Sequence, residues 1–255
     1  MDSYWLYPVL FLTGLVAGFV DSIAGGGGLI SIPVFLNLGM PVMDALGTSK
    51  LQATFGSGSA AWHFSRAGLI DFRGSRRGMV FTFLGAMLGT VALQRVDPGL
   101  LRQSIPWLLA AIALYMLFQP RLGDEDIHPR WGRQVFYVVF GLGLGFYDGF
   151  FGPGTGTFWA MAFLLGLGYN LTRATAHTKL MNFTSNVASL LLFVAGGHIQ
   201  YPAGLAMGAG QWLGARLGSR TVITKGTRLI RPVFITVVLA ITAKLLYQNL
   251  SKPSP

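Results

Sequence analysis

Two aspartates stand in stretches of the sequence that are otherwise apolar, and each is followed by glycines. Asp21 lies in GFVDSIAGGGG (18–28), and Asp148 occupies the equivalent place in GFYDGFFGPGT (145–155). A carboxylate in an apolar segment costs about 2.5–3.5 kcal/mol on membrane-insertion scales, so such a residue is functional, neutralised or engaged in a cap. Two roles stay open: coupling, by handling a proton or contacting a substrate, or bracing the chain by capping freed backbone amides.

Two lysines form a second matched pair. Lys50 in ALGTSKLQATFGS (45–57) aligns with Lys179 in ATAHTKLMNFTSN (174–186), and each opens a segment rich in small polar residues. Ammonium, amide and hydroxyl donors directed at one place would suit a small oxyanion. The alternative is that the lysines snorkel to the membrane interface. The side chains that we expect to bind substrate are Thr48, Lys50, Gln52, His177, Lys179, Asn182 and Asn186.

The glycine runs indicate where helices break. Without a Cβ, the chain can leave the helix at Gly26 and Gly27, and again at Gly154,. A half-helix that begins there would direct unpaired N–H groups and a positive dipole end into the protein, which attracts anions. Gly26, Gly27 and Gly154 therefore join the expected substrate site. The alternative is that these glycines only permit close helix packing, as we expect at the Gly14/Gly18 pair.

Other motifs carry less weight. Ser59 and His63 are four residues apart, so they share a helical face and could mimic an intramembrane hydrolase dyad,. The segment GSGSAA (56–61) matches a nucleotide-binding pattern, but no soluble βαβ unit surrounds it. No spacing of histidines and carboxylates suggests a metal, so neither metal nor cofactor is expected.

The composition places these residues in a membrane protein. Of 255 residues, 52% are hydrophobic and only 11% are charged, and mean hydropathy is +0.55, whereas soluble domains carry roughly a quarter charged residues. The formal net charge of +10 comes mostly from Lys and Arg in short segments between apolar stretches, which is typical of membrane topology rather than of nucleic-acid binding,. Since the chain has no cysteine, disulfides and thiolate chemistry are excluded.

The apolar stretches predict an all-α polytopic membrane protein. About 20 apolar residues are needed for each spanning helix, which gives about eight spanning segments plus two half-helices. The matched motifs divide the chain into two repeats, 1–125 and 126–255, of one integrated membrane domain. The predicted spans are 5–24, 43–66, 78–95, 100–119, 134–151, 172–195, 201–217 and 229–248, and the predicted half-helices are 28–40 and 153–169.

Loop charges indicate that the two repeats are inverted. The 66–77 loop carries four arginines, whereas its counterpart at 196–202 carries no Lys or Arg. The next pair reverses the bias, because 95–102 has two arginines and 216–231 has five basic residues. Positive loops stay in the cytoplasm, so equivalent loops lie on opposite sides. Inverted repeats with broken helices are the architecture of secondary transporters.

The paired motifs also resemble a known family. GFVDSIAGGGGLISIP, LGTSKLQA, GFYDGFFGPGTG and ATAHTKLMNFTSN are similar to segments of the sulfite exporter TauE/SafE family, also called the toluene-sulfonate uptake permeases, and most closely of its YfcA-like branch. The resemblance implies a multi-pass inner-membrane transporter of small sulfur-containing or organic anions, in either direction, and not an enzyme. The expected partners are a small anion, the lipid bilayer and a proton or sodium ion; a homodimer stays open, as does an anion channel of the same architecture.

Overall fold

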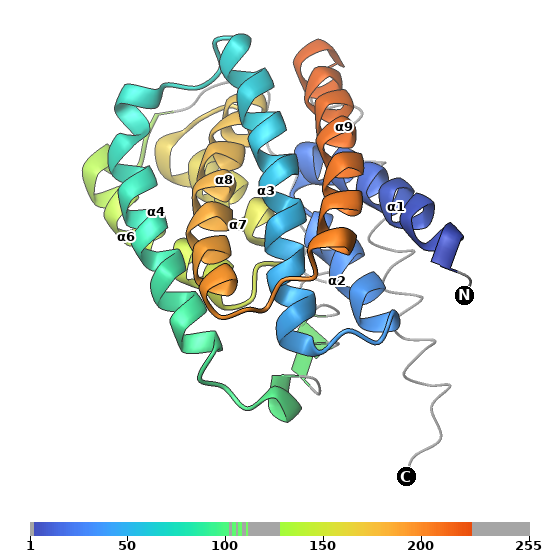
Figure 1. Ribbon diagram of the computed structural model, residues 1–255. Helices are drawn as coiled ribbons and strands as arrows, with labels where there is room; N and C mark the ends of the chain where they lie inside the picture. Colours follow the sequence, from blue (N-terminus) through green and yellow to red (C-terminus); the bar gives the residue numbers. More distant parts are fainter. Residues whose placement is uncertain (1–2, 102–103, 106, 109–110, 112–127, 226–255) are drawn as a thin grey trace.

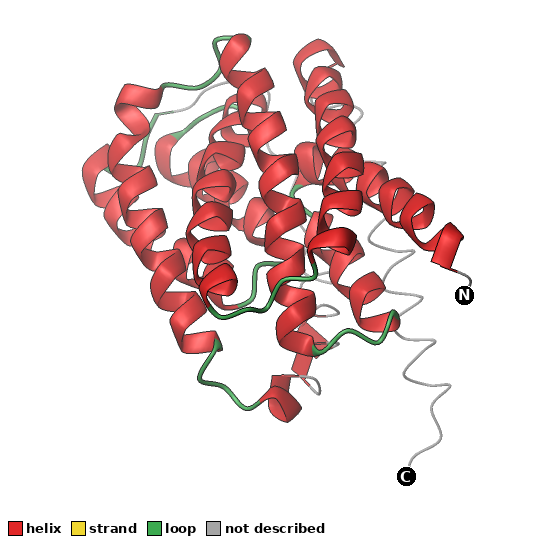
Figure 2. Cartoon of the chain, viewed as in Figure 1, coloured by secondary structure: helices red, strands yellow, loops and turns green. Residues whose placement is uncertain are grey.

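The computed structural model describes residues 3–101, 104–105, 107–108, 111 and 128–225 of the chain. Every regular element in this part is an α-helix, as predicted (Figure 2). With the labels of Figure 1, the helices are α1 (Ser3–Ala24), α2 (Gly27–Asn37), α3 (Val42–Arg66), α4 (Phe72–Leu93), α6 (Arg133–Phe150), α7 (Thr155–Leu167), α8 (Leu171–Ala195) and α9 (Tyr201–Lys225).

The helices follow the predicted apolar stretches closely. The spans predicted at 5–24, 43–66, 134–151 and 172–195 coincide with α1, α3, α6 and α8, and the two short apolar pieces form α2 and α7. The predicted span 100–119 falls largely outside the described residues, and 229–248 falls wholly outside them. The number of membrane crossings therefore stays a prediction.

Two helices extend into segments that the sequence predicts as loops. The predicted 66–77 loop is wrong in its extent, because α4 already begins at Phe72. The cause is a cap: Asp71 Oδ1 accepts the N–H of Gly74 at 2.9 Å, which stabilises the first turn. Likewise α9 continues to Lys225, so the predicted 216–231 loop begins inside a helix. Arg73, Arg76 and Arg77 thus lie in the first two turns of α4, and Arg216, Arg220 and Lys225 lie in the C-terminal part of α9.

The chain leaves the helix at both glycine runs. Gly25, which separates α1 from α2, has a φ of +81°, and Gly152 and Gly154, between α6 and α7, have φ of +95° and +82°. Side chains are disfavoured in this left-handed region, whereas glycine adopts it freely. The long helices α1 and α6 are therefore each followed by a short helix, α2 beginning at Gly27 and α7 directly after Gly154.

The order of elements recurs, and the two sets of helices interleave. Each set contains a long helix, a short helix and two more long helices. The first helix of one set packs along the last helix of the other, so α1 lies against α9 and α6 lies against α4 (Figure 1). Glycines permit the close approach: a Cβ at Gly210 would lie 1.9 Å from the Phe11 carbonyl oxygen, and one at Gly89 would lie 2.0 Å from that of Phe146,.

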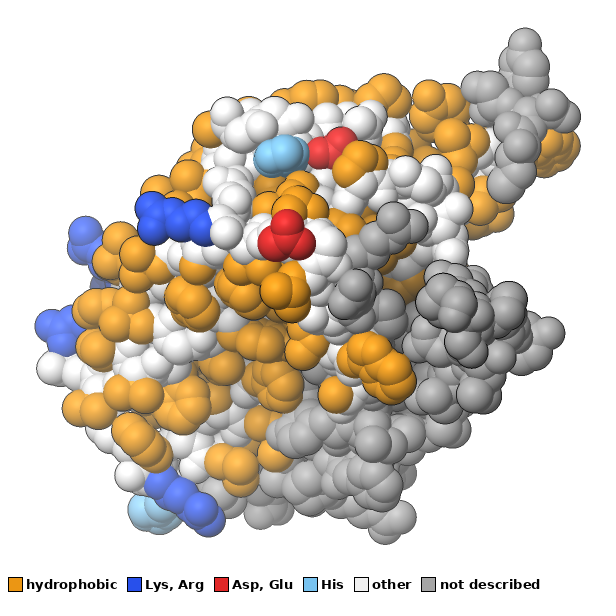
Figure 3. Space-filling view, turned by 90° about the horizontal axis from the view of Figure 1, so that it is seen from below, with side chains coloured by type: hydrophobic (Ala, Val, Ile, Leu, Met, Phe, Trp, Pro, Cys, Tyr) orange, Lys and Arg blue, Asp and Glu red, His pale blue; other side chains and the backbone are white. Residues whose placement is uncertain are grey.

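Much of the described surface is apolar. Large hydrophobic side chains are exposed along α1, α3, α4, α6, α8 and α9. Seen from below Figure 1, the described face is mostly hydrophobic or uncharged, with basic side chains near its edge (Figure 3). Among the described helices, the segment Trp5–Ile23 is long and apolar enough to cross a membrane by length and composition. Contiguous exposed apolar surface indicates contact with lipid or protein.

Candidate functional site

The two glycine breaks meet near the centre of the molecule. A Cβ added to Gly25 would lie 2.7 Å from the backbone of Gly156, so the starts of α2 and α7 are in contact. Beside this contact is a cavity of about 50 Å³, which has room for one small ion or a small number of waters, since about 10–15 Å³ holds one water. Residues from seven helices line it, among them Asp21, Lys50, Asp148, Asn182, Asn186 and Gln211.

Lys50 on α3 is buried and paired with Asp148 on α6. Its Nζ lies 2.7 Å from Asp148 Oδ1 and also donates to the Asp148 carbonyl oxygen at 2.5 Å. The other carboxylate oxygen accepts a hydrogen bond from the Ser185 hydroxyl on α8. Asp148 is thus held by side chains of two helices rather than used to cap α7.

Lys179 on α8 makes the corresponding pair with Asp21 on α1. Lys179 Nζ lies 3.0 Å from Asp21 Oδ2, and the lysine side chain is 1% exposed. The other oxygen, Oδ1, accepts the N–H of Gly27, the first residue of α2, at 3.1 Å. Asp21 therefore does brace the glycine break, and it does so while neutralising a lysine. The buried positions of both lysines contradict the snorkelling alternative.

The two pairs are crossed between the matched motifs. Lys50 in the first half contacts the aspartate of the second half, and Lys179 in the second half contacts the aspartate of the first. A buried charge that loses its partner is strongly destabilising, by about 3–5 kcal/mol. The two pairs therefore tie the halves of the chain together at the cavity.

Thr48 and His177 form a second crossed set, away from the cavity. Thr48 Oγ1 accepts the N–H of Gln200, just before α9, at 3.0 Å. At the aligned position, His177 Nε2 accepts the N–H of Asp71, just before α4, at 3.3 Å. Asp71 also pairs with Arg133 at 3.2 Å. The hydrogen bond from the Gly74 N–H and the nearby Arg133 guanidinium hold the pKa of the Asp71 carboxyl below its usual range. These residues fasten loops at the two ends of the molecule.

The structure brings together only part of the expected binding site. Lys50, Asn182, Asn186 and Gly154 line the cavity, together with both aspartates. Lys179 does not line the cavity but pairs with Asp21, which does. Gly26 and Gly27 form the start of α2. Thr48, Gln52 and His177 do not line it; Gln52 Nε2 instead donates to Ser31 Oγ at 3.0 Å. Helical spacing alone cannot tell which face of α3 or α8 turns to the cavity.

Sequence reasoning missed Gln211 on α9. Its side chain is 1% exposed and lines the cavity, and its Oε1 has no hydrogen-bond partner. Asn182 Oδ1, which also lines the cavity, is unpartnered as well. The two ends of an amide side chain are exchangeable by a flip, so each residue can offer N–H donors to a ligand. The available signal in the sequence was a polar glutamine within the glycine-rich, apolar stretch MGAGQWLG (207–214).

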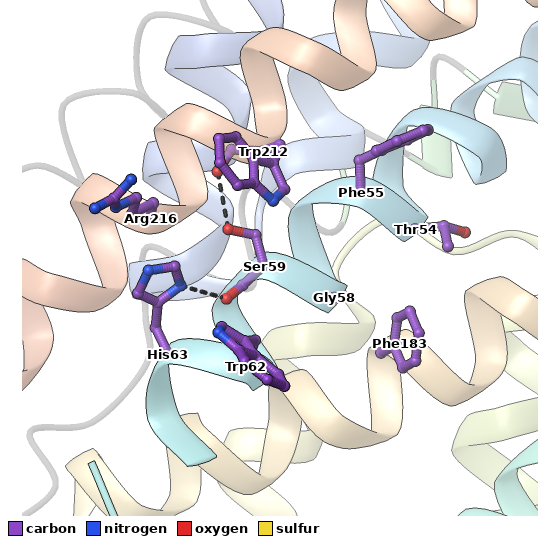
Figure 4. Close-up of a pocket in the computed structure, with 9 residues that line it drawn as sticks. All are labelled: Thr54, Phe55, Gly58, Ser59, Trp62, His63, Phe183, Trp212 and Arg216. Carbon is purple, nitrogen blue, oxygen red and sulfur yellow. Dashed lines mark hydrogen bonds between the residues drawn. The ribbon is translucent and has the colours of Figure 1, made fainter. Parts of the chain in front are cut away.

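The proposed hydrolase dyad does not form. Ser59 Oγ donates to the Trp212 carbonyl oxygen at 2.9 Å, and His63 Nδ1 donates to the Ser59 carbonyl oxygen at 2.7 Å (Figure 4). A catalytic histidine has to accept the proton of the serine hydroxyl. The geometry therefore contradicts a dyad of Ser59 and His63.

Known proteins similar to this chain are described as membrane transporters. The family model "Sulfite exporter TauE/SafE" matches residues 10–245. A probable membrane transporter protein of Haemophilus influenzae is 48% identical over 244 residues, which cover 96% of each chain. The probable membrane transporter protein YfcA of Escherichia coli K12 is 47% identical over 98% of this chain and 93% of its own, and YdhB of Bacillus subtilis, with the same description, is 24% identical over 91% and 96%. No solved structure matches.

Proposed function

The chain belongs to the sulfite exporter TauE/SafE family, and on that premise we propose that it is a secondary transporter of a small anion, a sulfur-containing oxyanion or an organosulfonate. Its family and the names of its relatives identify the chain as a membrane transporter. We place it in the cytoplasmic membrane as a multi-pass protein that works by alternating access. The observation that carries the proposal is the central cavity between two broken helices, with Lys50 at its wall.

An inverted repeat is part of the proposal. Asp44, in the first turn of α3, contacts His198 of the α8–α9 loop at 3.0 Å, whereas Asp71 of the α3–α4 loop lies beyond the other end of α3. A helix of 25 residues is about 37 Å long,. The equivalent loops 67–71 and 196–200 thus lie at opposite ends of the molecule (Figure 1). That arrangement supports repeats of opposite orientation, with the arginine-rich end in the cytoplasm.

Charge balance at the cavity favours cation coupling. Lys50, Lys179, Asp21 and Asp148 sum to zero formal charge. An anion that bound without a cation would leave a net negative charge in a site of low dielectric constant, which is costly. The anion would replace Asp148 at Lys50 Nζ, and the released carboxylate would take up a proton while Ser185 keeps it in place. A sodium ion beside the carboxylate would balance the charge equally well.

The test is transport by the purified chain in proteoliposomes. Sulfite, sulfoacetate and toluene-sulfonate are offered with sulfate as the comparison anion, and an inward pH or sodium gradient is imposed. We expect one of the sulfur anions to accumulate above its external concentration. Equilibration without accumulation under either gradient would identify an anion channel, and no movement of any tested anion would contradict the proposed substrate class.

Variants connect this transport to the cavity. Lys50→Gln should weaken anion binding by about 1.5–3 kcal/mol through the loss of one charge-assisted contact. Lys179→Gln should weaken it less, because Lys179 contacts Asp21 and does not line the cavity. Lys225→Gln is the matched control, because Lys225 is exposed at the end of α9. Asp148→Asn should abolish accumulation driven by the gradient and retain exchange of substrate for substrate, since an amide cannot cycle a proton. Equal transport by all three lysine variants would show that the anion does not bind in the cavity.

A further inference from the structure

A second, larger hollow lies on the outside of the helices, away from the central cavity. Its volume is about 530 Å³, and it runs between α3 and α9 with Phe183 of α8 at one side. We call it the α3–α9 groove; its lining residues are Thr54, Phe55, Gly58, Ser59, Trp62, His63, Phe183, Trp212 and Arg216 (Figure 4). The site described above uses none of these side chains.

The groove has a basic end and an aromatic end. Figure 4 shows Arg216 and His63 together at one end, and Phe55 and Phe183 at the other. Along α3 the lining runs from Thr54 to His63, which at 1.5 Å per residue is about 14 Å,. Half the thickness of a bilayer's hydrocarbon core is about 15 Å. The groove therefore has the length and polarity of one lipid leaflet.

The floor of the groove is fixed by hydrogen bonds. The Ser59 hydroxyl joins α3 to the Trp212 carbonyl oxygen of α9, and His63 is anchored through Nδ1. This leaves His63 Nε2 for a ligand, which it can serve as a donor when the ring is protonated. Arg66 adds a cation at the same end, 5.9 Å from the centroid of the Trp62 ring.

We propose that the α3–α9 groove binds an anionic phospholipid, with the phosphate at Arg216 and an acyl chain along Phe55, Phe183 and Trp212. Arginine is well suited to bind phosphate oxygens. The basic end of the groove lies near the C-terminal end of α3 and in the C-terminal half of α9. The loop charges assign these ends to the cytoplasm, and the cytoplasmic leaflet attracts such basic pockets through its anionic lipids. The proposal depends on the membrane location of the family and not on the transported anion.

A second copy of the chain fits this groove less well. Only nine residues of the chain are acidic, and Asp21, Asp44, Asp71 and Asp148 are already in ion pairs. A partner surface would have to supply negative charge to the basic end of the groove. An anionic lipid supplies that charge together with an apolar chain.

The test compares two lipids on the purified full-length chain in detergent. Phosphatidylglycerol and phosphatidylcholine with identical acyl chains are added, and thermal stability and lipid retention in native mass spectrometry are measured. We expect phosphatidylglycerol to raise the apparent Tm more than phosphatidylcholine, because a ligand that binds the folded state stabilises it. Equal shifts with the two lipids would overturn the proposal.

A matched pair of arginine variants locates the effect. Arg216→Gln should retain phosphatidylglycerol about tenfold less well than the wild type and lose most of the difference between the lipids. Arg220→Gln should behave like the wild type, since Arg220 is exposed one turn later on α9 and does not line the groove. Equal losses in both variants would mean general attraction of lipid to a basic surface. A dimer that Arg216→Gln dissociates, without any lipid effect, would assign the groove to a second copy.

Discussion

At the scale of single residues, each buried lysine forms an ion pair with one aspartate. Lys50 and Asp148 are 2.7 Å apart, and Lys179 and Asp21 are 3.0 Å apart. Each ion loses hydration on burial, and the attraction within a pair compensates for that loss only with good geometry and further hydrogen bonds. Ser185 and the Gly27 N–H supply such bonds. The pairs are therefore stable while intact and vulnerable to a single substitution.

Removing one member of a pair should destabilise the protein, and removing both should restore much of its stability. Lys50→Gln leaves Asp148 buried without its counter-ion, and we expect a loss of about 3–5 kcal/mol in the free energy of unfolding. The double variant Lys50→Gln/Asp148→Asn removes both charges, so it should unfold at a temperature near that of the wild type. Thermal unfolding in detergent measures the difference. A single variant as stable as the wild type would show that the pair does not form.

The cap made by Asp21 can be separated from its charge. Asp21→Asn and Asp21→Ala both leave Lys179 without a counter-ion, but only asparagine keeps an oxygen that accepts the Gly27 N–H,. We therefore expect Asp21→Ala to be less stable than Asp21→Asn by about 0.5–2 kcal/mol, the usual value of a cap. The same thermal measurement decides it, and identical unfolding temperatures would argue against the cap.

At the scale of elements, the short helices depend on glycines for two distinct reasons. Gly25 needs both a left-handed backbone and the absence of a side chain, because Gly156 is in contact with it. Gly39, after α2, has a similar φ of +80° but nothing within 4 Å of the position of a Cβ. The two positions share the conformational requirement and differ only in the close approach.

Alanine substitution should distinguish these positions. Gly39→Ala should cost about 1–2 kcal/mol, the strain of a left-handed residue, and retain transport. Gly25→Ala adds a clash with the backbone of α7 beside the cavity, so we expect it to abolish transport and to lower stability further. Proteoliposome transport and thermal unfolding are measured on both. If Gly25→Ala transports as well as Gly39→Ala, the contact between the broken helices is not needed for function.

At the scale of the whole molecule, the interleaving of the two helix sets is the dominant feature. Because α1 lies on α9 and α6 on α4, the long helices of each set pack mainly against helices of the other set. The two helix sets are also joined at the cavity by the crossed ion pairs, and at both ends of the molecule by the loop contacts of Thr48 and His177. Rocking of one repeat against the other, as alternating access needs, would have to act on these contacts.

The orientation of the loops is testable because the chain contains no cysteine. Ala67→Cys and Ala195→Cys place single thiols at the exposed ends of α3 and α8. Inverted repeats predict that an impermeant thiol reagent added to intact cells labels position 195 and leaves position 67 unlabelled until the membrane is opened. Labelling of both positions from the same side would contradict inverted repeats.

The sequence by itself determined the helices, their breaks and the chemistry present at the centre. Apolar runs predict α1, α3, α6 and α8 almost to the residue, and the glycines predict the ends of α1 and α6, because both signals act locally along the chain. The matched Asp21 and Asp148, and Lys50 and Lys179, could be recognised as charges in apolar segments without any knowledge of packing. The start of α4 was misplaced because the cap of Asp71 outweighs the polarity of the arginines that follow it.

Only the tertiary structure decided which of these residues meet. Sequence alignment matches lysine with lysine and aspartate with aspartate, whereas attraction requires opposite charges, so the real partners are crossed between the halves. The packing of the helices also places Thr48 and His177 at the loops and Gln211 at the cavity, and it joins α3 to α9 at the α3–α9 groove. Contacts between residues about a hundred or more positions apart depend on how helices pack, and no periodicity within a single segment contains that information.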